Sequence, residues 1–213
     1  MKRVQILLAD DHTLFCALLR KFLEPQYEVV GVVSDGRTLL KAAVELKPDV
    51  AVIDIGMPLL NGLDAGRELK RSMPNLKLVY LTMNANPDLA REALQNGASA
   101  YVLKNARSSE VLQAIKEALR GATYVAPQIK RAMDLIFIRD PAAAKRPQHL
   151  TERQREVLQM FAEGRSLKEI ADSLQIAYRT VRFHKFRIME ELGIKTNSEL
   201  VHYAIKHDMV SCA

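Results

Sequence analysis

The sequence predicts an α/β domain with a doubly wound, five-stranded parallel sheet, followed by an all-α domain of four helices that contains a helix-turn-helix. Three observations predict this order. Up to residue 121, short β-branched apolar runs alternate with longer runs of helical periodicity. Residues 139–147 are rich in proline, alanine and charge, as in an exposed linker. From residue 149 only helical patterns remain, so we expect domains at 1–121 and 149–213 joined by a linker at 122–148.

Five apolar runs of the first domain are expected to be strands: residues 4–9, 27–33, 50–54, 76–82 and 100–104. The segments between them place apolar residues at helical spacing, for example Leu14, Leu18 and Phe22. Strands that alternate with helices form parallel sheets covered on both faces, and such sheets bind ligands at the carboxyl ends of their strands. Functional residues are therefore expected where these runs end.

The linker is expected to begin with an amphipathic helix at residues 127–138. Ile129, Ala132, Met133 and Ile136 fall on one side of this helix. The two prolines and the charged residues that follow predict an extended, exposed connection.

The second domain carries clear helix boundaries. Thr151 with Gln154, and Ser166 with Glu169, match the capping box, in which two side chains satisfy backbone amides at the start of a helix. Ser198 is expected to cap a last helix that ends near residue 207. The tight turn expected between the second and third helices is typical of a helix-turn-helix.

Three acidic residues lie where expected strands end: Asp10 and Asp11 after the first, and Asp54 at the end of the third. Carboxylates that converge must bind a cation or take up a proton, and hard oxygen ligands suit Mg²⁺. Thr82 and Lys104 end the fourth and fifth strands with a hydroxyl and an ammonium, which suit the oxygens of a transferring phosphoryl group. Asp54 is then the candidate nucleophile. For Asp10 or Asp11 alone, simple capping of the next helix is the alternative.

Composition and one missing motif exclude other classes. The turn at residues 8–13 contains no glycine, so it matches neither the dinucleotide-binding nor the P-loop fingerprint. Two cysteines are too few for a disulfide framework. No apolar run approaches the ~18 residues of a membrane helix. The chain is therefore expected to be a cytoplasmic protein that does not bind membranes. Its net charge of +6 is only a weak argument for a nucleic-acid partner.

Segments 8–15, 54–62, 81–82 and 101–104 resemble the motifs of a two-component receiver domain, over residues 1 to about 121. The resemblance implies that a sensor histidine kinase donates a phosphoryl group to Asp54. It also implies that Mg²⁺ is held by Asp10, Asp11, Asp54 and the carbonyl of Gly56.

The same resemblance assigns the remaining pocket residues. Lys104 and Thr82 would contact the phosphoryl group, and Tyr101 would turn inward as Thr82 moves. An ordinary edge-strand aromatic is the alternative for Tyr101. One position departs from the family, because Asn105 stands where many receivers have a proline after the lysine. The peptide after Lys104 is therefore either cis at a cost of ~2.5–4 kcal/mol or trans with a changed approach of the lysine.

Segments 150–158, 168–171, 180–184 and 188–189 resemble the LuxR/NarL-type DNA-binding domain, over residues 149 to about 209. A receiver followed by this domain resembles the NarL/FixJ-type response regulators. The resemblance implies base contacts by Arg182, Phe183 and Phe186, and phosphate contacts by Lys168, Thr180 and His184. A packed histidine at the core margin is the alternative for His184.

The residues agree with a recognition helix at 178–192. Val181, Ile188 and Leu192 share a face that can pack on the rest of the domain. From Ser173 to Met189 there is no acidic residue, while four basic residues suit phosphates and guanine edges: Arg179, Arg182, Lys185 and Arg187. A solvated basic face is the alternative.

Phe183 and Phe186 fall on the outward face of this helix, which is unusual unless something covers them. DNA is one cover, through thymine methyl groups. The receiver domain is another, docked over the recognition helix in the unphosphorylated chain. Core packing is a third, which the helical phase disfavours.

The last helix has an apolar strip formed by Leu200, Val201, Ala204 and Ile205. By resemblance, such domains dimerise through this helix on paired half-sites. Packing within the domain is the alternative.

Together these features predict a phosphorylation-controlled transcription factor that binds promoter DNA as a homodimer, and no enzyme beyond slow self-dephosphorylation. Phosphorylation would release the helix-turn-helix domain. A Mg²⁺-dependent phosphohydrolase is an alternative, although the sequence has no insertion for a substrate lid. A receiver that no longer takes up phosphate is another, although its acids and Lys104 are intact.

Overall fold

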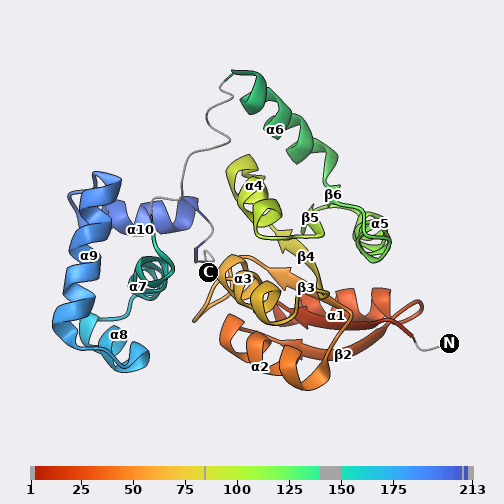
Figure 1. Cartoon of the computed structure of the whole chain (residues 1–213), viewed down its shortest axis with the longest axis horizontal. Helices are drawn as coiled ribbons and strands as arrows, with labels where there is room; N and C mark the ends of the chain where they lie inside the picture. The colour runs from red at the N-terminus through yellow and green to blue at the C-terminus, as the bar shows by residue number, and fades with distance from the viewer. Residues whose placement is uncertain (1–2, 84, 140–149, 208, 211–213) are drawn as a thin grey trace.

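The structure is a computed structural model that describes residues 3–83, 85–139, 150–207 and 209–210. The first domain contains a parallel sheet in the strand order β2-β1-β3-β4-β5-β6 (Figure 1). The strands are β1 (Gln5–Ala9), β2 (Glu28–Val33), β3 (Val50–Asp54), β4 (Lys77–Thr82), β5 (Ala100–Leu103) and β6 (Tyr124–Val125).

The expectation of five strands was one strand short. β6 pairs with β5 in parallel, with Tyr124 opposite Ala100 and Val125 opposite Tyr101. Two residues are too few to show the alternation by which a strand is recognised in a sequence. The other five strands occupy the expected positions.

Helices cover both faces of this sheet. They are α1 (Thr13–Leu23), α2 (Gly36–Leu46), α3 (Gly62–Ser72), α4 (Pro87–Gln95) and α5 (Ser108–Leu119). Apolar residues of α1 and α5 form one core with one face of the sheet, and those of α2, α3 and α4 form a second core with the other face. Successive strand residues alternate between the cores, so Ile6 and Leu8 of β1 belong to one while Leu7 and Ala9 belong to the other.

The strand order reverses between β1 and β3. From β1 the chain goes first to the edge strand β2, then returns past β1 to β3 and continues toward the other edge. The carboxyl ends of β1 and β3 therefore lie side by side at the switch point, where doubly wound sheets bind their ligands.

The predicted linker helix is α6 (Pro127–Arg139). Ile129 is buried and Met133 partly buried in the core that α4 also joins. The side chain of Ile136 and the connection at residues 140–149 lie outside what the structure describes.

The second domain consists of α7 (Glu152–Ala162), α8 (Leu167–Leu174), α9 (Tyr178–Leu192) and α10 (Asn197–Lys206). Both predicted capping boxes are present, at Thr151 and Ser166. The predicted cap at Ser198 was wrong, because Thr196 caps α10 two residues earlier in a third capping box with Glu199. A two-residue shift is common, since the sequence offers a hydroxyl at both positions.

α8 and α9 form the helix-turn-helix. Gln175 ends α8 in the left-handed conformation, with φ of 52°, and α9 begins three residues later. As predicted, Val181 and Ile188 of α9 are buried with Val157 and Ile170. No helix within the described residues combines the length and the apolar character needed to cross a membrane.

Candidate phosphorylation site and nucleic-acid interface

Two acidic side chains and one lysine meet at the carboxyl edge of the sheet. Lys104 follows β5, and its Nζ lies 2.9 Å from Asp10 Oδ2 and 3.0 Å from Asp54 Oδ2. Asp10 and Asp54 are buried. The structure therefore brings together residues that the sequence places at the ends of three different strands.

Asp11 and His12 extend this cluster toward solvent. One ligand atom from each of Asp10, Asp11, His12 and Asp54 lies within 4.8 Å of all the others. His12 Nδ1 is 2.8 Å from Asp11 Oδ1 and 3.2 Å from Asp10 Oδ1. The sequence analysis missed His12, although its place directly after two aspartates was a signal. Three carboxylates beside one ammonium leave an excess of negative charge, and this donor set fits a hard divalent cation.

Thr82 and Tyr101 lie on neighbouring strands beside this cluster. Thr82 is buried at the end of β4, and its carbonyl accepts a hydrogen bond of 2.8 Å from the backbone N–H of Lys104. Tyr101 is fully buried in the core shared by α4 and α6. The resemblance implies that Tyr101 turns inward when Thr82 moves. In this structure the ring of Tyr101 is already in the inward position.

The peptide after Lys104 is trans, since no cis peptide bond occurs in the described part of the chain. The trans alternative for the peptide between Lys104 and Asn105 is therefore correct. Lys104 still reaches both Asp10 and Asp54 without a proline at the next position.

Burial controls the acid–base behaviour of Asp54. Loss of hydration raises the pKa of its carboxyl group to about 6, and the charges of Asp10 and Asp11 act in the same direction against the ammonium of Lys104. A cation held beside these carboxylates would oppose this rise. Cys16 lies behind Asp10, and burial raises the pKa of its thiol to about 11. It is a neutral core thiol at physiological pH.

The outward face of α9 carries the candidate nucleic-acid contacts. Arg179, Arg182 and Arg187 are exposed on it. Phe183 and Phe186 are 60% and 64% exposed, so core packing was the wrong alternative for them. The receiver does not cover these rings either, because they keep this exposure with both domains present, whereas α7 forms hydrogen bonds and ion pairs with the receiver.

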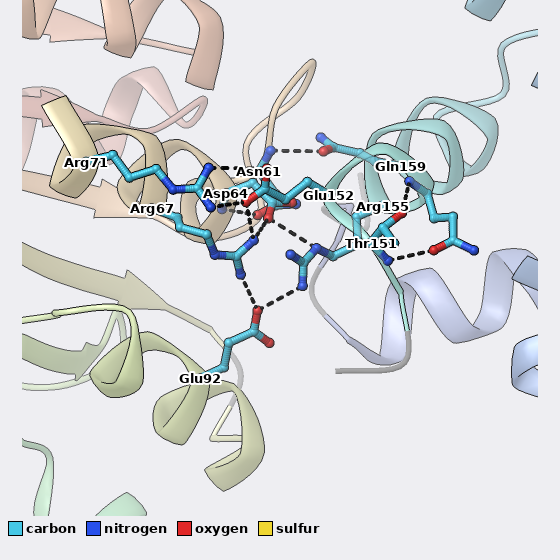
Figure 2. A network of polar contacts seen from close by, with 10 residues as sticks. Asn61, Asp64, Arg67, Arg71, Glu92, Thr151, Glu152, Arg155 and Gln159 are labelled. Carbon is cyan, nitrogen blue, oxygen red and sulfur yellow. Dashed lines mark hydrogen bonds and ion pairs between the residues drawn. The ribbon is translucent and has the colours of Figure 1, made fainter. Parts of the chain in front are cut away.

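Figure 1 shows α7 on the side of the second domain that faces the receiver. Gln159 of α7 is fully buried, and its side-chain oxygen accepts a hydrogen bond of 2.9 Å from the backbone N–H of Asn61 (Figure 2). Arg155 Nη1 of α7 lies 3.2 Å from Glu92 Oε1 of α4. These contacts dock α7 on the receiver.

The other predicted contacts differ in accessibility. Lys168 is exposed on α8, and Thr180 is half-buried. His184 is half-buried, and its pKa is lowered by burial and by the nearby charge of Arg153. Lys185 points toward its own domain, where its Nζ is 2.7 Å from Asn197 Oδ1 and 4.3 Å from the centre of the Phe161 ring.

The predicted role in dimerisation was wrong for two of the four residues of the apolar strip on α10. Leu200 and Ala204 are fully buried in the core of the second domain, so their side chains cannot contact another subunit. Packing within the domain was the right alternative for them. Val201 is half-buried and Ile205 is 37% exposed, so these two remain on the surface of α10.

The fold and its two sites define a class of protein. A buried carboxylate with acidic neighbours, a hydroxyl and an ammonium at a switch point is equipped to accept a phosphoryl group. A helix-turn-helix with an exposed basic helix is equipped to enter the major groove of DNA. One chain that holds both is a phosphorylation-responsive DNA-binding protein.

Comparison with known proteins gives the family. The family model of the response regulator receiver domain matches residues 6–116, and that of the luxR family of bacterial regulatory proteins matches residues 148–204. The chain is 34% identical over 212 residues to response regulator GacA of Pseudomonas aeruginosa, covering 99% of each. It is 35% identical over 215 residues to oxygen regulatory protein NreC of Staphylococcus aureus, covering 97% of this chain and 99% of that protein.

A solved structure shares the whole architecture. RcsB from Salmonella enterica serovar Typhimurium, bound to a promoter in the presence of the phosphomimetic BeF3−, is 27% identical, with a TM-score of 0.68 over 96% of this chain and 99% of that chain. The protein belongs to the two-component response regulators of the NarL/FixJ type, which join a receiver to a LuxR-type domain. It is a phosphorylation-controlled, DNA-binding regulator of transcription.

Proposed function

We propose that Asp54 is the phosphoacceptor and that a sensor histidine kinase is the donor. A carboxylate oxygen of Asp54 forms the new P–O bond while the P–N bond to the kinase imidazole breaks. The observation that carries this proposal is the position of Lys104, with its ammonium 2.9 Å from Asp10 and 3.0 Å from Asp54 at the switch point of the sheet.

The neighbouring side chains have separate roles. Asp10, Asp11, Asp54 and the carbonyl of Gly56 hold Mg²⁺, which when bound supplies positive charge beside the carboxylates and the incoming phosphoryl oxygens. Lys104 and the hydroxyl of Thr82 then bind those oxygens. Thr82 and the buried ring of Tyr101 form the switch that reports phosphorylation to the surface of the receiver.

The output is binding to double-stranded promoter DNA by the domain at residues 149–213, connected to the receiver at 1–121 through residues 122–148. Base contacts come from Arg182, Phe183 and Phe186 on the exposed face of α9. Backbone contacts come from the surrounding polar and basic residues: Lys168, Arg179, Thr180, His184 and Arg187. Lys185, which points toward Asn197 and Phe161, is left out of this set. Val201 and Ile205 of α10 join two copies on paired half-sites.

Two further properties follow from this proposal. The protein acts in the cytoplasm, where kinase and DNA are both accessible. Any reaction of its own is a slow hydrolysis of the Asp54 phosphoryl group, which returns the chain to its resting state.

Phosphorylation and DNA selection test the proposal together. The full chain is treated with acetyl phosphate and Mg²⁺, and fragments of random DNA are selected with and without this donor. We expect a gain in mass of one phosphoryl group and stronger DNA selection in the wild type, but neither in Asp54→Asn. Asp49→Asn, at an exposed aspartate before β3, is the matched control and is expected to behave as wild type.

Two results would contradict the proposal. Donor-dependent DNA binding that persists in Asp54→Asn would remove Asp54 from the switch. Turnover of small phosphoesters by the wild type would favour the phosphohydrolase alternative instead.

A further inference from the structure

His12, the residue before the first residue of α1, places a nitrogen beside the carboxylates of the phosphorylation pocket. Its Nδ1 lies 2.8 Å from Asp11 Oδ1 and 3.2 Å from Asp10 Oδ1. The side chain is 54% exposed, yet its ring faces the acids. The backbone N–H of His12 also donates a hydrogen bond of 2.9 Å to Asp10 Oδ1, which holds the residue in this place. The pocket therefore contains a nitrogen donor besides its oxygens.

The four side chains are close enough to bind one ion together. One ligand atom from each of Asp10, Asp11, His12 and Asp54 lies within 4.8 Å of all the others. Ligand atoms around one small ion are separated by at most twice the metal–ligand distance, or about 4–4.4 Å. The cluster is thus only slightly wider than the coordination sphere of a single ion.

Two oxygens of this cluster are shielded from solvent in a way that points to a cation. Among the residues that the structure describes, neither Asp10 Oδ2 nor Asp11 Oδ1 accepts a hydrogen bond. Their contacts are ion pairs, of Asp10 with Lys104 and of Asp11 with His12. Asp10 is 5% exposed, and a carboxylate so deeply buried costs free energy unless positive charge compensates it. One ammonium does not compensate three carboxylates.

The nitrogen changes which cations this donor set prefers. Carboxylates, carbonyls and water suit Mg²⁺, whereas an imidazole suits Zn²⁺ and other first-row transition-metal ions. Three carboxylates and one imidazole also supply the four ligands that Zn²⁺ takes in closed sites. Mg²⁺ retains several waters and has no preference for nitrogen. The two cations therefore share the carboxylates, and only the transition-metal ion uses His12.

We propose that His12 makes the phosphorylation pocket a binding site for a first-row transition-metal ion, with Zn²⁺ as the ion to be tested. Its consequence for phosphorylation rests on the proposed role of Asp54. Four protein ligands complete the coordination of Zn²⁺ and leave no position for an oxygen of the phosphoryl group, whereas Mg²⁺ keeps positions that water occupies. Binding of Zn²⁺ and phosphorylation of Asp54 therefore exclude each other, and His12 determines the cation specificity of the pocket.

Metal affinity of the full chain tests the site without any phosphorylation. Zn²⁺ and Mg²⁺ are each titrated by calorimetry into wild type and His12→Asn. The ratio of Zn²⁺ affinity to Mg²⁺ affinity is expected to fall at least about 10-fold in His12→Asn, because even residues that only orient a metal ligand are worth about 10–100-fold. His202→Asn, at an exposed histidine of α10, is the matched control and should keep the wild-type ratio.

Two measurements complete the test. The chemical shift of the His12 ring nitrogen should change when Zn²⁺ binds and stay constant with Mg²⁺. In excess Mg²⁺, Zn²⁺ should inhibit phosphorylation by acetyl phosphate in wild type and His202→Asn, and inhibition of His12→Asn should need at least about 10-fold more Zn²⁺. Asparagine is a favourable residue before the first residue of a helix, so His12→Asn is expected to fold, which urea unfolding verifies.

Three results would overturn the inference. One is the same ratio of Zn²⁺ to Mg²⁺ affinity in wild type and His12→Asn. Another is an unchanged His12 ring signal in a chain saturated with Zn²⁺, and the third is equal inhibition of wild type and His12→Asn by Zn²⁺. A failure of the proposed function looks different, because acetyl phosphate would then modify no variant at Asp54. The Zn²⁺ affinities and the ring signal would still report whether His12 binds the ion.

Discussion

Lys104 Nζ lies 3.0 Å from Asp54 Oδ2, and both side chains are buried at the switch point of the sheet. The ammonium does not fully compensate the buried carboxylate, because Asp10 and Asp11 add negative charge and the pKa of Asp54 stays raised, at about 6. In the absence of a cation, an ionised Asp54 therefore destabilises the folded chain at neutral pH.

Asp54→Asn is accordingly expected to stabilise the metal-free protein. The rise in the pKa of Asp54 from 3.8 to about 6 lowers the free energy of unfolding of the wild type by roughly 1–3 kcal/mol at pH 7, since each pKa unit corresponds to about 1.4 kcal/mol. Urea unfolding in EDTA measures this gain. Addition of Mg²⁺ should then stabilise the wild type more than the variant, because a ligand of the folded state shifts its stability by mass action. Equal stabilisation of both by Mg²⁺ would place the cation elsewhere.

The same effect predicts a pH dependence of known sign. Well below pH 3.8, Asp54 is protonated in both the folded and the unfolded chain, and wild type and Asp54→Asn should be equally stable. Between about pH 4 and 6 the folded chain holds the proton more tightly, so the wild type loses stability relative to the variant as pH rises. Unfolding curves in EDTA across this range give the difference. A difference that shrinks with rising pH would contradict the prediction.

The exposed ion pair between Arg71 of α3 and Glu152 of α7 offers a separate probe of domain docking. Arg71 Nη2 lies 2.8 Å from Glu152 Oε1, and the two side chains are 64% and 48% exposed. Arg71→Glu alone is expected to weaken docking about two- to five-fold, as exposed pairs contribute up to about 1 kcal/mol. The double variant Arg71→Glu with Glu152→Arg should restore only part of the docking, because Arg67 Nη1 lies 3.6 Å from Glu152 Oε1 and would repel an arginine at that position. Hydrogen exchange at Asn61 is the measurement, and a double variant no better than Arg71→Glu would exclude this pairing.

The pocket was predictable from the sequence and the domain contact was not, for a physical reason. Asp54 and Thr82 end their strands, and Asp10 and Lys104 directly follow theirs. Parallel topology brings such strand ends together whatever the details of packing. Gln159, in contrast, is one polar residue on the outer face of an amphipathic helix. Its burial depends on which surface docks there, and no local pattern encodes that choice. The same limit explains why the sequence left open whether the receiver covers α9.

The division of α10 between core and surface was missed for a related reason. Four apolar residues at positions 200, 201, 204 and 205 form one strip, and helical spacing alone does not divide them. Packing against α7 buries Leu200 and Ala204, whereas Ile205 stays partly exposed. The way α10 packs on α7, and not the composition of the strip, therefore determines which of its apolar residues remain accessible to a partner.

Exposure of Phe183 and Phe186 predicts a loss of DNA binding without a loss of stability. Each change to Ala is expected to weaken binding to the selected site about 5–20-fold, or ~1–2 kcal/mol, while unfolding shifts by less than about 0.5 kcal/mol. Leu200→Ala is the contrasting control, since removal of a buried leucine costs about 2–5 kcal/mol of stability. Gel-shift titration and urea unfolding give the two quantities.

Thymine methyl groups are the expected partners of these rings. Deoxyuridine in place of thymidine at the contacted positions should weaken wild-type binding and leave the affected Phe→Ala variant nearly unchanged. Equal losses in wild type and variant would show that the rings contact something other than the methyl groups.

Because α7 docks while α9 stays exposed, phosphorylation is expected to act on pairing of the DNA-binding domains. BeF3− should change the affinity for a single half-site less than about two-fold, and raise that for two correctly spaced half-sites about 10-fold or more. Ile205→Asp, on the accessible part of α10, should abolish the gain on paired sites and leave the single site unaffected. Titration of both DNA lengths by fluorescence anisotropy separates the two effects. A single half-site that responds to BeF3− as strongly as the pair would mean that docking hinders α9 itself, despite its exposed phenylalanines.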